Sequence, residues 1–124
     1  AFTLKQIAFR ENVLETLELI SSKEKQLDYQ KSVPHVDVAA ELFCEWEDCF
    51  QSVKDKDWFQ RVFSEAEMAA LNDFNAVFED VAGQTPKVLP PLDEFMNSEP
   101  WRDLSAGARA ALSRLRPAPD ADPA

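Results

Sequence analysis

The sequence predicts an all-α fold, as a compact bundle or irregular array of four to five helices. Three observations lead to this prediction. The 124 residues include only two glycines, whereas leucine, alanine, glutamate and phenylalanine are plentiful, a balance that favours helices over turn-rich β structure. Apolar residues recur at steps of three and four along several segments, which is the spacing of one helix face. Short connectors that are charged or contain proline separate these segments, as in small bundles.

The first segment runs from about Thr3 to about Lys31. Thr3 can cap its start. Its apolar positions recur at helical spacing and are expected to face the core: Leu4, Ile7, Leu14, Leu17, Ile20 and Leu27. Ser21 and Ser22 weaken the middle, so we expect a kink or break there. Pro34 ends the segment, because the residue before a proline is pushed towards extended geometry.

The second segment begins after Asp37, a good N-cap residue, and runs to about Val53. Its core-facing stripe is predicted to consist of Ala39, Phe43, Trp46, Phe50 and Val53. The opposite, solvated face lies about 200° further round and carries Glu41, Glu45, Asp48 and Ser52. The connector from Lys54 to Gln60 can form a short helical turn.

The third segment has the clearest start. Ser64 and Glu67 form a capping-box pattern, and Phe63 before them can act as a hydrophobic staple. The apolar stripe of this helix is predicted to be Met68, Leu71, Phe74, Phe78 and Val81. Gly83 is expected to end the helix in the left-handed conformation.

The last part of the chain begins with a predicted loop over residues 84–91, followed by a single turn over residues 92–96. Ser98 is expected to cap a final helix, with Pro100 in its first turn, where proline is tolerated. The apolar face of this helix comprises Trp101, Leu104, Ala108, Ala111, Leu112 and Leu115. Pro117 ends it. We therefore expect a single helical domain over residues 1–116 and a flexible tail over residues 117–124, which has little to bury.

The formal net charge of −10 is concentrated in the middle of the chain. Residues 37–103 contain sixteen acidic and five basic residues, whereas residues 1–36 are balanced. A field of this sign repels nucleic acid and anionic membranes and attracts basic proteins. The alternative is that the charge only keeps the protein soluble.

The cysteines and the hydropathy pattern bear on the compartment. Cys44 and Cys49 are five residues apart on one predicted helix, so their side chains diverge and an internal disulfide is not expected. Free thiols fit a reducing compartment. No run of about 20 apolar residues exists, and the N-terminal sequence lacks a signal-peptide core. We therefore expect a cytoplasmic protein that does not span a membrane.

The sequence carries no recognisable catalytic or cofactor-binding pattern. A single histidine, His35, cannot supply paired-histidine metal motifs, and two glycines cannot supply a glycine-rich phosphate loop. Cys44 and Cys49 lie among acidic residues, which disfavour a thiolate nucleophile. We expect a non-catalytic protein that uses neither a cofactor nor a metal.

What remains is an acidic surface with aromatic side chains. The candidate partner-binding residues are Glu41, Glu45, Asp48, Asp55, Asp57, Trp58, Glu65, Asp73 and Asp80. Asp73 and Asp80 are seven residues apart and share one helix stripe, with Glu65 near them. Trp58, beside Phe59 in a polar connector, could provide an aromatic anchor for a basic protein. A solvated acidic face and an aromatic core plug explain the same residues and stay open as alternatives.

The chain from residue 58 to residue 115 also resembles a known family. WFQRVFSEAEMAALNDFNAVFEDV, followed by PPLDEFMNSEPW and LSAGARAALSRL, is similar to small helical immunity proteins of bacterial polymorphic toxin and contact-dependent growth inhibition systems. The shared features are an aromatic residue before a capped acidic helix and a Pro-Trp helix start.

The resemblance implies a protein that neutralises a cognate toxin acting on nucleic acid, such as a nuclease, by covering its basic surface. The alternative is an adaptor or regulatory subunit that binds a helix or a basic tail of a partner protein. The sequence leaves open the identity of the toxin and the oligomeric state.

Overall fold

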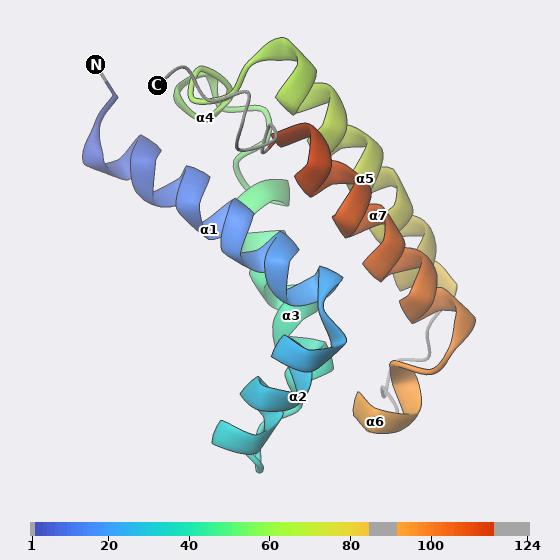
Figure 1. Cartoon of the computed structure of the whole chain (residues 1–124). Coiled ribbons are helices and arrows are strands. Elements are labelled where there is room, and N and C mark those ends of the chain that lie inside the picture. The colour runs from blue at the N-terminus through green and yellow to red at the C-terminus, as the bar shows by residue number, and fades with distance from the viewer. Residues whose placement is uncertain (1, 85–91, 116–124) are drawn as a thin grey trace.

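The structure, a computed structural model, describes residues 2–84 and 92–115, and in these ranges the chain forms helices and no strand (Figure 1). This confirms the predicted all-α class. The elements are α1 (Leu4–Ser21), α2 (Lys23–Ser32), α3 (Val38–Trp46), the π-helical turn η1 (Glu47–Gln51), α4 (Asp57–Gln60), α5 (Glu65–Gln84), α6 (Leu92–Phe95) and α7 (Glu99–Leu115). The predicted loop over 84–91 lies outside the described residues except for Gln84, which belongs to α5. The stop at Pro117 and the tail over 117–124 also lie outside the described residues.

The bundle is organised around α7, which packs against both α1 and α5. The α5 and α7 helices run side by side in opposite directions (Figure 1). The α3 helix closes the core through Trp46, whose ring lies edge-on to that of Phe74 on α5, 4.7 Å away, and stacks on that of Phe50, also at 4.7 Å. Aromatic burial of this size supplies a large share of the hydrophobic stabilisation.

Each buried indole has a hydrogen-bond acceptor. The Trp46 indole nitrogen donates to the side-chain oxygen of Asn75 at 2.9 Å, and that of Trp101 donates to Gln26 at 3.0 Å. Asn75 also accepts from Gln51 at 2.9 Å. A buried N–H without a partner would cost about 1–3 kcal/mol, so these two amides are part of the core's stability.

The predicted helix starts are confirmed by hydrogen bonds. Thr3 and Gln6 form a reciprocal capping box, as do Ser64 and Glu67. The Asp37 carboxylate accepts a hydrogen bond from a backbone N–H in the first turn of α3 at 3.3 Å. The Ser98 hydroxyl accepts one from a backbone N–H in the first turn of α7 at 3.4 Å. The predicted single turns over α4 and α6 are also present.

The predicted break in the first segment falls at Ser22, which is both the C-cap of α1 and the N-cap of α2. Side chains from other elements satisfy the carbonyls at the end of α1. The Gln26 amide donates to those of Leu19 and Ile20, at 2.8 and 2.9 Å, and Arg109 on α7 donates to that of Ser21 at 2.9 Å. The joint is therefore fixed without a glycine.

The predicted stop at Gly83 was wrong. Gly83 has no positive φ, and α5 continues through it to Gln84. Added side-chain atoms would meet nothing within 4 Å at this exposed position. The Gln84 amide donates to the Asp80 carboxylate at 3.0 Å, a bond between successive turns that supports the continued helix.

The predicted core face of α1 was wrong in part. Leu4 is 87% exposed and Ile7 42%, and Leu27 on α2 is also exposed. Polar Gln6 is buried instead, because its amide donates to the Trp58 carbonyl at 2.7 Å. A polar residue with such a partner can occupy a core-facing position, and this rotates the buried face relative to the apolar pattern.

The second segment is not one continuous α-helix. Its α-helical part ends at Trp46, and the next five residues form η1. This turn places Cys49 towards Thr16 on α1, 3.8 Å from sulfur to hydroxyl oxygen, and Gln51 towards Asn75 on α5. The π turn thus lets one helix contact both neighbours.

Candidate protein-binding surface

The short helix α4 holds Trp58 at one end of the molecule. The Trp58 ring is half-buried and lies edge-on to Phe9 on α1, with centroids 5.1 Å apart. The ammonium of Lys5 lies 4.2 Å from the centre of the Trp58 ring. The backbone carbonyl of Trp58 accepts from Gln6. Trp58 is therefore packed on one side and reachable by a partner on the other.

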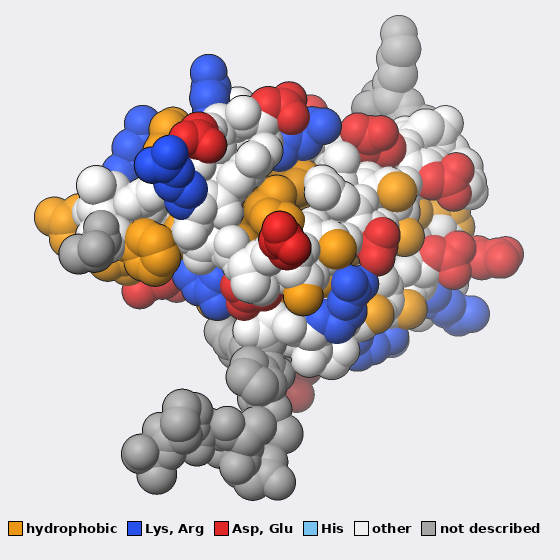
Figure 2. All heavy atoms as spheres, turned by 90° about the horizontal axis from the view of Figure 1, so that it is seen from above, with side chains coloured by type: hydrophobic (Ala, Val, Ile, Leu, Met, Phe, Trp, Pro, Cys, Tyr) orange, Lys and Arg blue, Asp and Glu red, His pale blue; other side chains and the backbone are white. Residues whose placement is uncertain are grey.

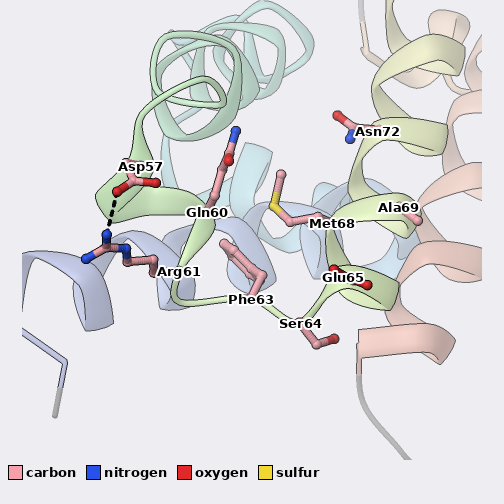
Figure 3. A pocket seen from close by; sticks show the side chains of 9 residues that line it. All are labelled: Asp57, Gln60, Arg61, Phe63, Ser64, Glu65, Met68, Ala69 and Asn72. Carbon is pink, nitrogen blue, oxygen red and sulfur yellow. Dashed lines mark ion pairs between the residues drawn. The ribbon is translucent and has the colours of Figure 1, made fainter.

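Two hollows flank α4. The first, of about 570 Å³, is lined by Thr3, Lys5, Gln6, Asp57, Trp58 and Arg61. The second, of about 530 Å³, is lined by Asp57, Gln60, Arg61, Phe63, Ser64, Glu65, Met68, Ala69 and Asn72 (Figure 3). Asp57 and Arg61 line both hollows and form an exposed ion pair of 2.8 Å where they meet. We call these two hollows, together with the exposed Leu4 and Ile7 of the α1 segment that borders the first hollow, the α4 surface.

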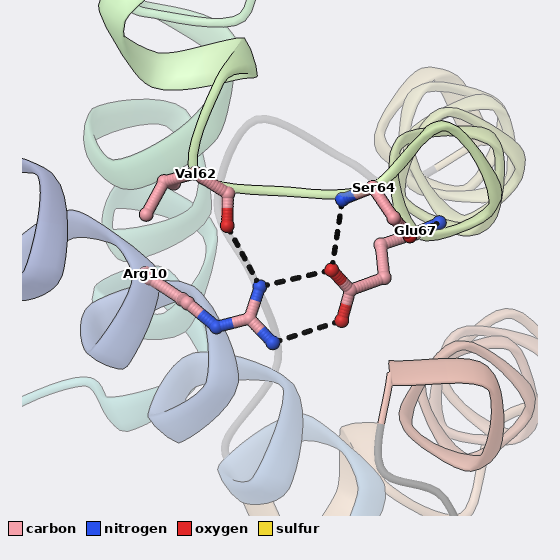
Figure 4. Close-up of polar contacts among 4 residues, drawn as sticks. All are labelled: Arg10, Val62, Ser64 and Glu67. Carbon is pink, nitrogen blue, oxygen red and sulfur yellow. Dashed lines mark hydrogen bonds and ion pairs between the residues drawn. The ribbon is translucent and has the colours of Figure 1, made fainter. Parts of the chain in front are cut away.

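The connection between α4 and α5 is held to α1 by Arg10 (Figure 4). The Arg10 guanidinium donates to the Val62 carbonyl at 3.0 Å and to both Glu67 oxygens at 3.0 and 2.8 Å. Burial opposes ionisation of Glu67, but the bonds from Arg10 and from the Ser64 N–H outweigh it and lower the pKa of Glu67. This network fixes the position of the second hollow relative to α1.

The predicted acids of α3 and η1 are all exposed. Glu41, Glu45 and Asp48 point to solvent, and none of them forms an ion pair with a described residue. Their charges gather around the exposed Cys44, whose pKa is raised by burial and then by these acids together with Glu47. They form one acidic stripe, which we call the α3 stripe.

The predicted acids of α5 lie elsewhere. Asp73 pairs with Arg114 on α7 at 2.8 Å, which places it on the flank of α5 beside α7. Asn75, two residues on and therefore about 200° round the helix, faces Trp46 of α3. Asp73, and Asp80 seven residues later on the same stripe, are thus turned away from α3.

The structure therefore divides the nine candidate residues among separate places. Asp57, Trp58 and Glu65 line the α4 surface, and Asp55 lies exposed in the adjoining connector. The α3 stripe and the pair Asp73 and Asp80 lie on different sides of the bundle. Because of these separate positions, the candidate acids do not form one continuous acidic face. Acidic and basic side chains are also interspersed on the face shown in Figure 2.

Sequence reasoning missed several residues of the α4 surface. Leu4 and Ile7 were assigned to the core, and Lys5 and Arg61 were not singled out although they line the first hollow. A helical period shows which residues share a face and does not show which face is covered.

The thiols are poor nucleophiles in this fold. Burial raises the pKa of Cys49 to about 12, although the Thr16 hydroxyl partly opposes this effect. Both thiols are free, with Cys49 buried and Cys44 exposed. A thiolate is the reactive form of cysteine, so neither side chain is activated for nucleophilic attack at neutral pH.

The described residues offer neither a metal-binding cluster nor a membrane-spanning helix. No group of three or more histidine, cysteine, aspartate or glutamate side chains there is arranged to bind a metal ion. In the same residues, no helix combines the length and the apolar character needed to cross a bilayer. Comparison of the chain with protein-family models, curated proteins and solved structures gave no match.

Proposed function

We propose that this protein acts by binding another protein, with the α4 surface as the contact region, and that it is not an enzyme. One observation carries the proposal. Three of the four large apolar side chains that are exposed in the described residues, Phe2, Leu4 and Ile7, lie at or just before the start of α1, the segment whose Thr3, Lys5 and Gln6 line the hollow that contains Trp58. When a partner covers exposed apolar groups beside a concave surface, their removal from water lowers the free energy of the complex.

The partner is proposed to be basic. The net charge of −10 and the unpaired acids of the α3 stripe attract a cationic protein over long range and raise the association rate. Trp58 and Leu4 would then supply most of the affinity at short range, as buried aromatic and apolar anchors do.

Among basic partners we propose a protein toxin that acts on nucleic acid. The protein would be its cytoplasmic immunity protein and would cover the basic surface that the toxin uses to bind its substrate. The resemblance of residues 58–115 to immunity proteins and the acidic charge support this proposal. A toxin of this kind requires a cationic cleft, because its substrate carries one negative charge per phosphate.

The experiment is co-expression with the product of the adjacent gene, followed by size-exclusion chromatography with light scattering. We expect a one-to-one complex that weakens as salt is raised. Leu4→Ser and Trp58→Ala should each weaken it about tenfold or more. Leu27→Ser is the matched control, because Leu27 is also exposed but lies on α2, and it should leave the affinity unchanged. Wild-type affinity in both α4-surface variants would refute the proposed contact region.

The acidic charges need a separate test. Reversal of Glu45, Asp48, Asp73 or Asp80 to lysine should lower the association rate and weaken its dependence on salt. The dissociation rate should change less than the association rate. Association rates that stay at the wild-type value in all four variants would show that the acids only solvate the surface.

A second candidate function is an adaptor that binds a helix or a basic tail. The second hollow favours it, because apolar Phe63 and Met68 line the groove and the acids Asp57 and Glu65 flank it (Figure 3). This shape suits an amphipathic segment with cationic residues. Binding that is lost in Met68→Glu but kept in Leu4→Ser would favour the adaptor over the immunity protein.

A further inference from the structure

A third hollow, remote from α4, lies where the start of α2 and the turn after α6 meet α7. Its volume is about 230 Å³, and its lining includes Lys23, Asn97, Trp101, Arg102, Ser105 and Arg109. Three of its lining residues are cationic and none is acidic. In a chain with 23 acidic and 13 basic residues, a concave site with this charge is unexpected and requires an explanation.

None of the three cations forms an ion pair with another described residue. Arg109 uses one guanidinium nitrogen to donate to the Ser21 carbonyl, which leaves its other N–H groups for a ligand. Like charges brought together without counter-charges destabilise a fold, and a bound anion would remove that cost.

The fold assembles this cluster from distant parts of the chain. Arg102 and Arg109 are seven residues apart and therefore share one side of α7, with Ser105 between them. Lys23 is the first residue of α2, directly after the break at Ser22. The bond from Arg109 to the end of α1 holds this break against α7. In the sequence, Lys23 is grouped with other lysines and Arg109 with other arginines, so the cluster exists only in the folded chain.

The side chains define the class of ligand. Guanidinium groups offer paired N–H donors that match two oxygens of a phosphate, and the lysine ammonium adds a compact charge. The Trp101 ring contributes an apolar wall, because its own N–H is already bonded to Gln26. Acidic residues adjoin two of these cations in the chain, Glu24 beside Lys23 and Asp103 beside Arg102. Neither acid lines the hollow, so the side chains nearest to a bound group include three cations and no acid.

We infer that this hollow, which we call the α2–α7 hollow, binds a phosphate group. The ligand is either inorganic phosphate or the phosphoryl end of a small metabolite. A hollow of this size, bordered by α2, α7 and the turn after α6, fits such a group better than it fits a length of polypeptide. The inference is independent of the proposed protein-binding function, because none of its residues belongs to the α4 surface.

The test is a titration of the isotopically labelled full chain with sodium phosphate, followed by NMR at constant pH and ionic strength. We expect saturable shifts of the amide signals of Lys23, Arg102 and Ser105 and of the Trp101 indole N–H. Arg102→Gln and Lys23→Gln should each weaken binding about tenfold, since each removes a charge-assisted contact. Both side chains are exposed, so the variants should keep the wild-type circular dichroism spectrum.

The control is Lys31→Gln, which removes an exposed lysine of the same helix outside the hollow and should bind as the wild type does. A second titration uses glycerol 3-phosphate. Tighter binding of this monoester assigns the site to a phosphorylated metabolite, and equal or weaker binding assigns it to the free ion. No saturable shift, equal weakening in Lys31→Gln and Arg102→Gln, or a response to an acidic peptide without one to phosphate would overturn the inference.

Discussion

Single polar residues decide much of the core of this protein. Asn75 and Gln26 are buried and bind the two buried indoles, and each bonds at least one further group. A buried amide is costly by itself, but it becomes stabilising when its donors and acceptors are matched. The hydrophobic pattern could not predict these residues, because a period analysis counts every polar side chain as exposed.

Replacement of Asn75 should therefore measure the cost in stability of a buried indole N–H that has no hydrogen-bond acceptor. We expect Asn75→Ala to lower the free energy of unfolding by about 1–3 kcal/mol, because the Trp46 N–H stays buried without its acceptor. Urea unfolding followed by tryptophan fluorescence measures this change. Asn72→Ala is the control, since Asn72 is exposed on the same helix, and it should change stability by less than about 0.5 kcal/mol. Equal effects of the two substitutions would contradict the role given to Asn75.

At the scale of the helices, local signals were predictable and tertiary ones were not. The starts at Thr3, Asp37, Ser64 and Ser98 follow from side chains that bond the first turn, and such bonds depend only on neighbouring residues. The π turn could not be predicted from neighbouring residues, because its side chains Cys49 and Gln51 contact two different helices. The helical continuation through Gly83 is a local feature that was not predicted, because a glycine near a helix end favours a stop, whereas here Gln84 bonds Asp80 one turn before it.

The contact between α1 and α5 should make stability depend on pH. Folding lowers the pKa of Glu67, so the ionised carboxylate contributes stability above its ordinary pKa of about 4.3, and this contribution is lost as pH falls towards the lower folded value. We expect Glu67→Gln to cost about 1 kcal/mol near neutral pH, given the partial exposure of the ion pair with Arg10. The difference from wild type should shrink when urea unfolding is repeated in acid.

The matched control is Glu65→Gln, which changes an exposed glutamate in the same first turn of α5. Its effect should be smaller than that of Glu67→Gln near neutral pH. Glutamine at position 67 can still accept a hydrogen bond from the Ser64 N–H. The Glu67→Gln variant therefore mainly measures the effect of removing the negative charge. A stability difference that stayed constant from neutral to acid pH would contradict the assignment of that difference to the ion pair with Arg10.

At the scale of the whole molecule, charge opposes folding. The chain carries ten excess negative charges, and self-repulsion of this kind is reduced by salt. We expect the double variant Glu45→Gln/Asp48→Asn to raise the melting temperature near 10 mM salt and to lose most of this advantage near 150 mM. Asp73→Asn should give no such gain, because it breaks the pair with Arg114. Differential scanning calorimetry at neutral pH checks both outcomes.

The candidate site was predictable only in its parts. Exposure of the acids follows from composition. The half-buried Trp58 lies between the two alternatives, an aromatic anchor and a core plug, that its position in the chain left open. The grouping of the acids does not follow from composition or position in the chain, because it depends on which flank of α5 faces α7 and which faces α3. The cluster of Lys23, Arg102 and Arg109 shows the same limit, since it combines residues that are about 80 positions apart in the sequence.

The one-residue joint at Ser22 also constrains how this protein can evolve. Insertions and deletions usually accumulate between helices, where added length costs little. Here a single inserted residue would turn α2 by about 100° relative to α1. It would withdraw Gln26 from the Trp101 indole and Lys23 from the α2–α7 hollow at once. Homologous chains that keep this architecture should therefore vary in length after α2 and between α5 and α6, but keep a fixed number of residues between the cores of α1 and α2.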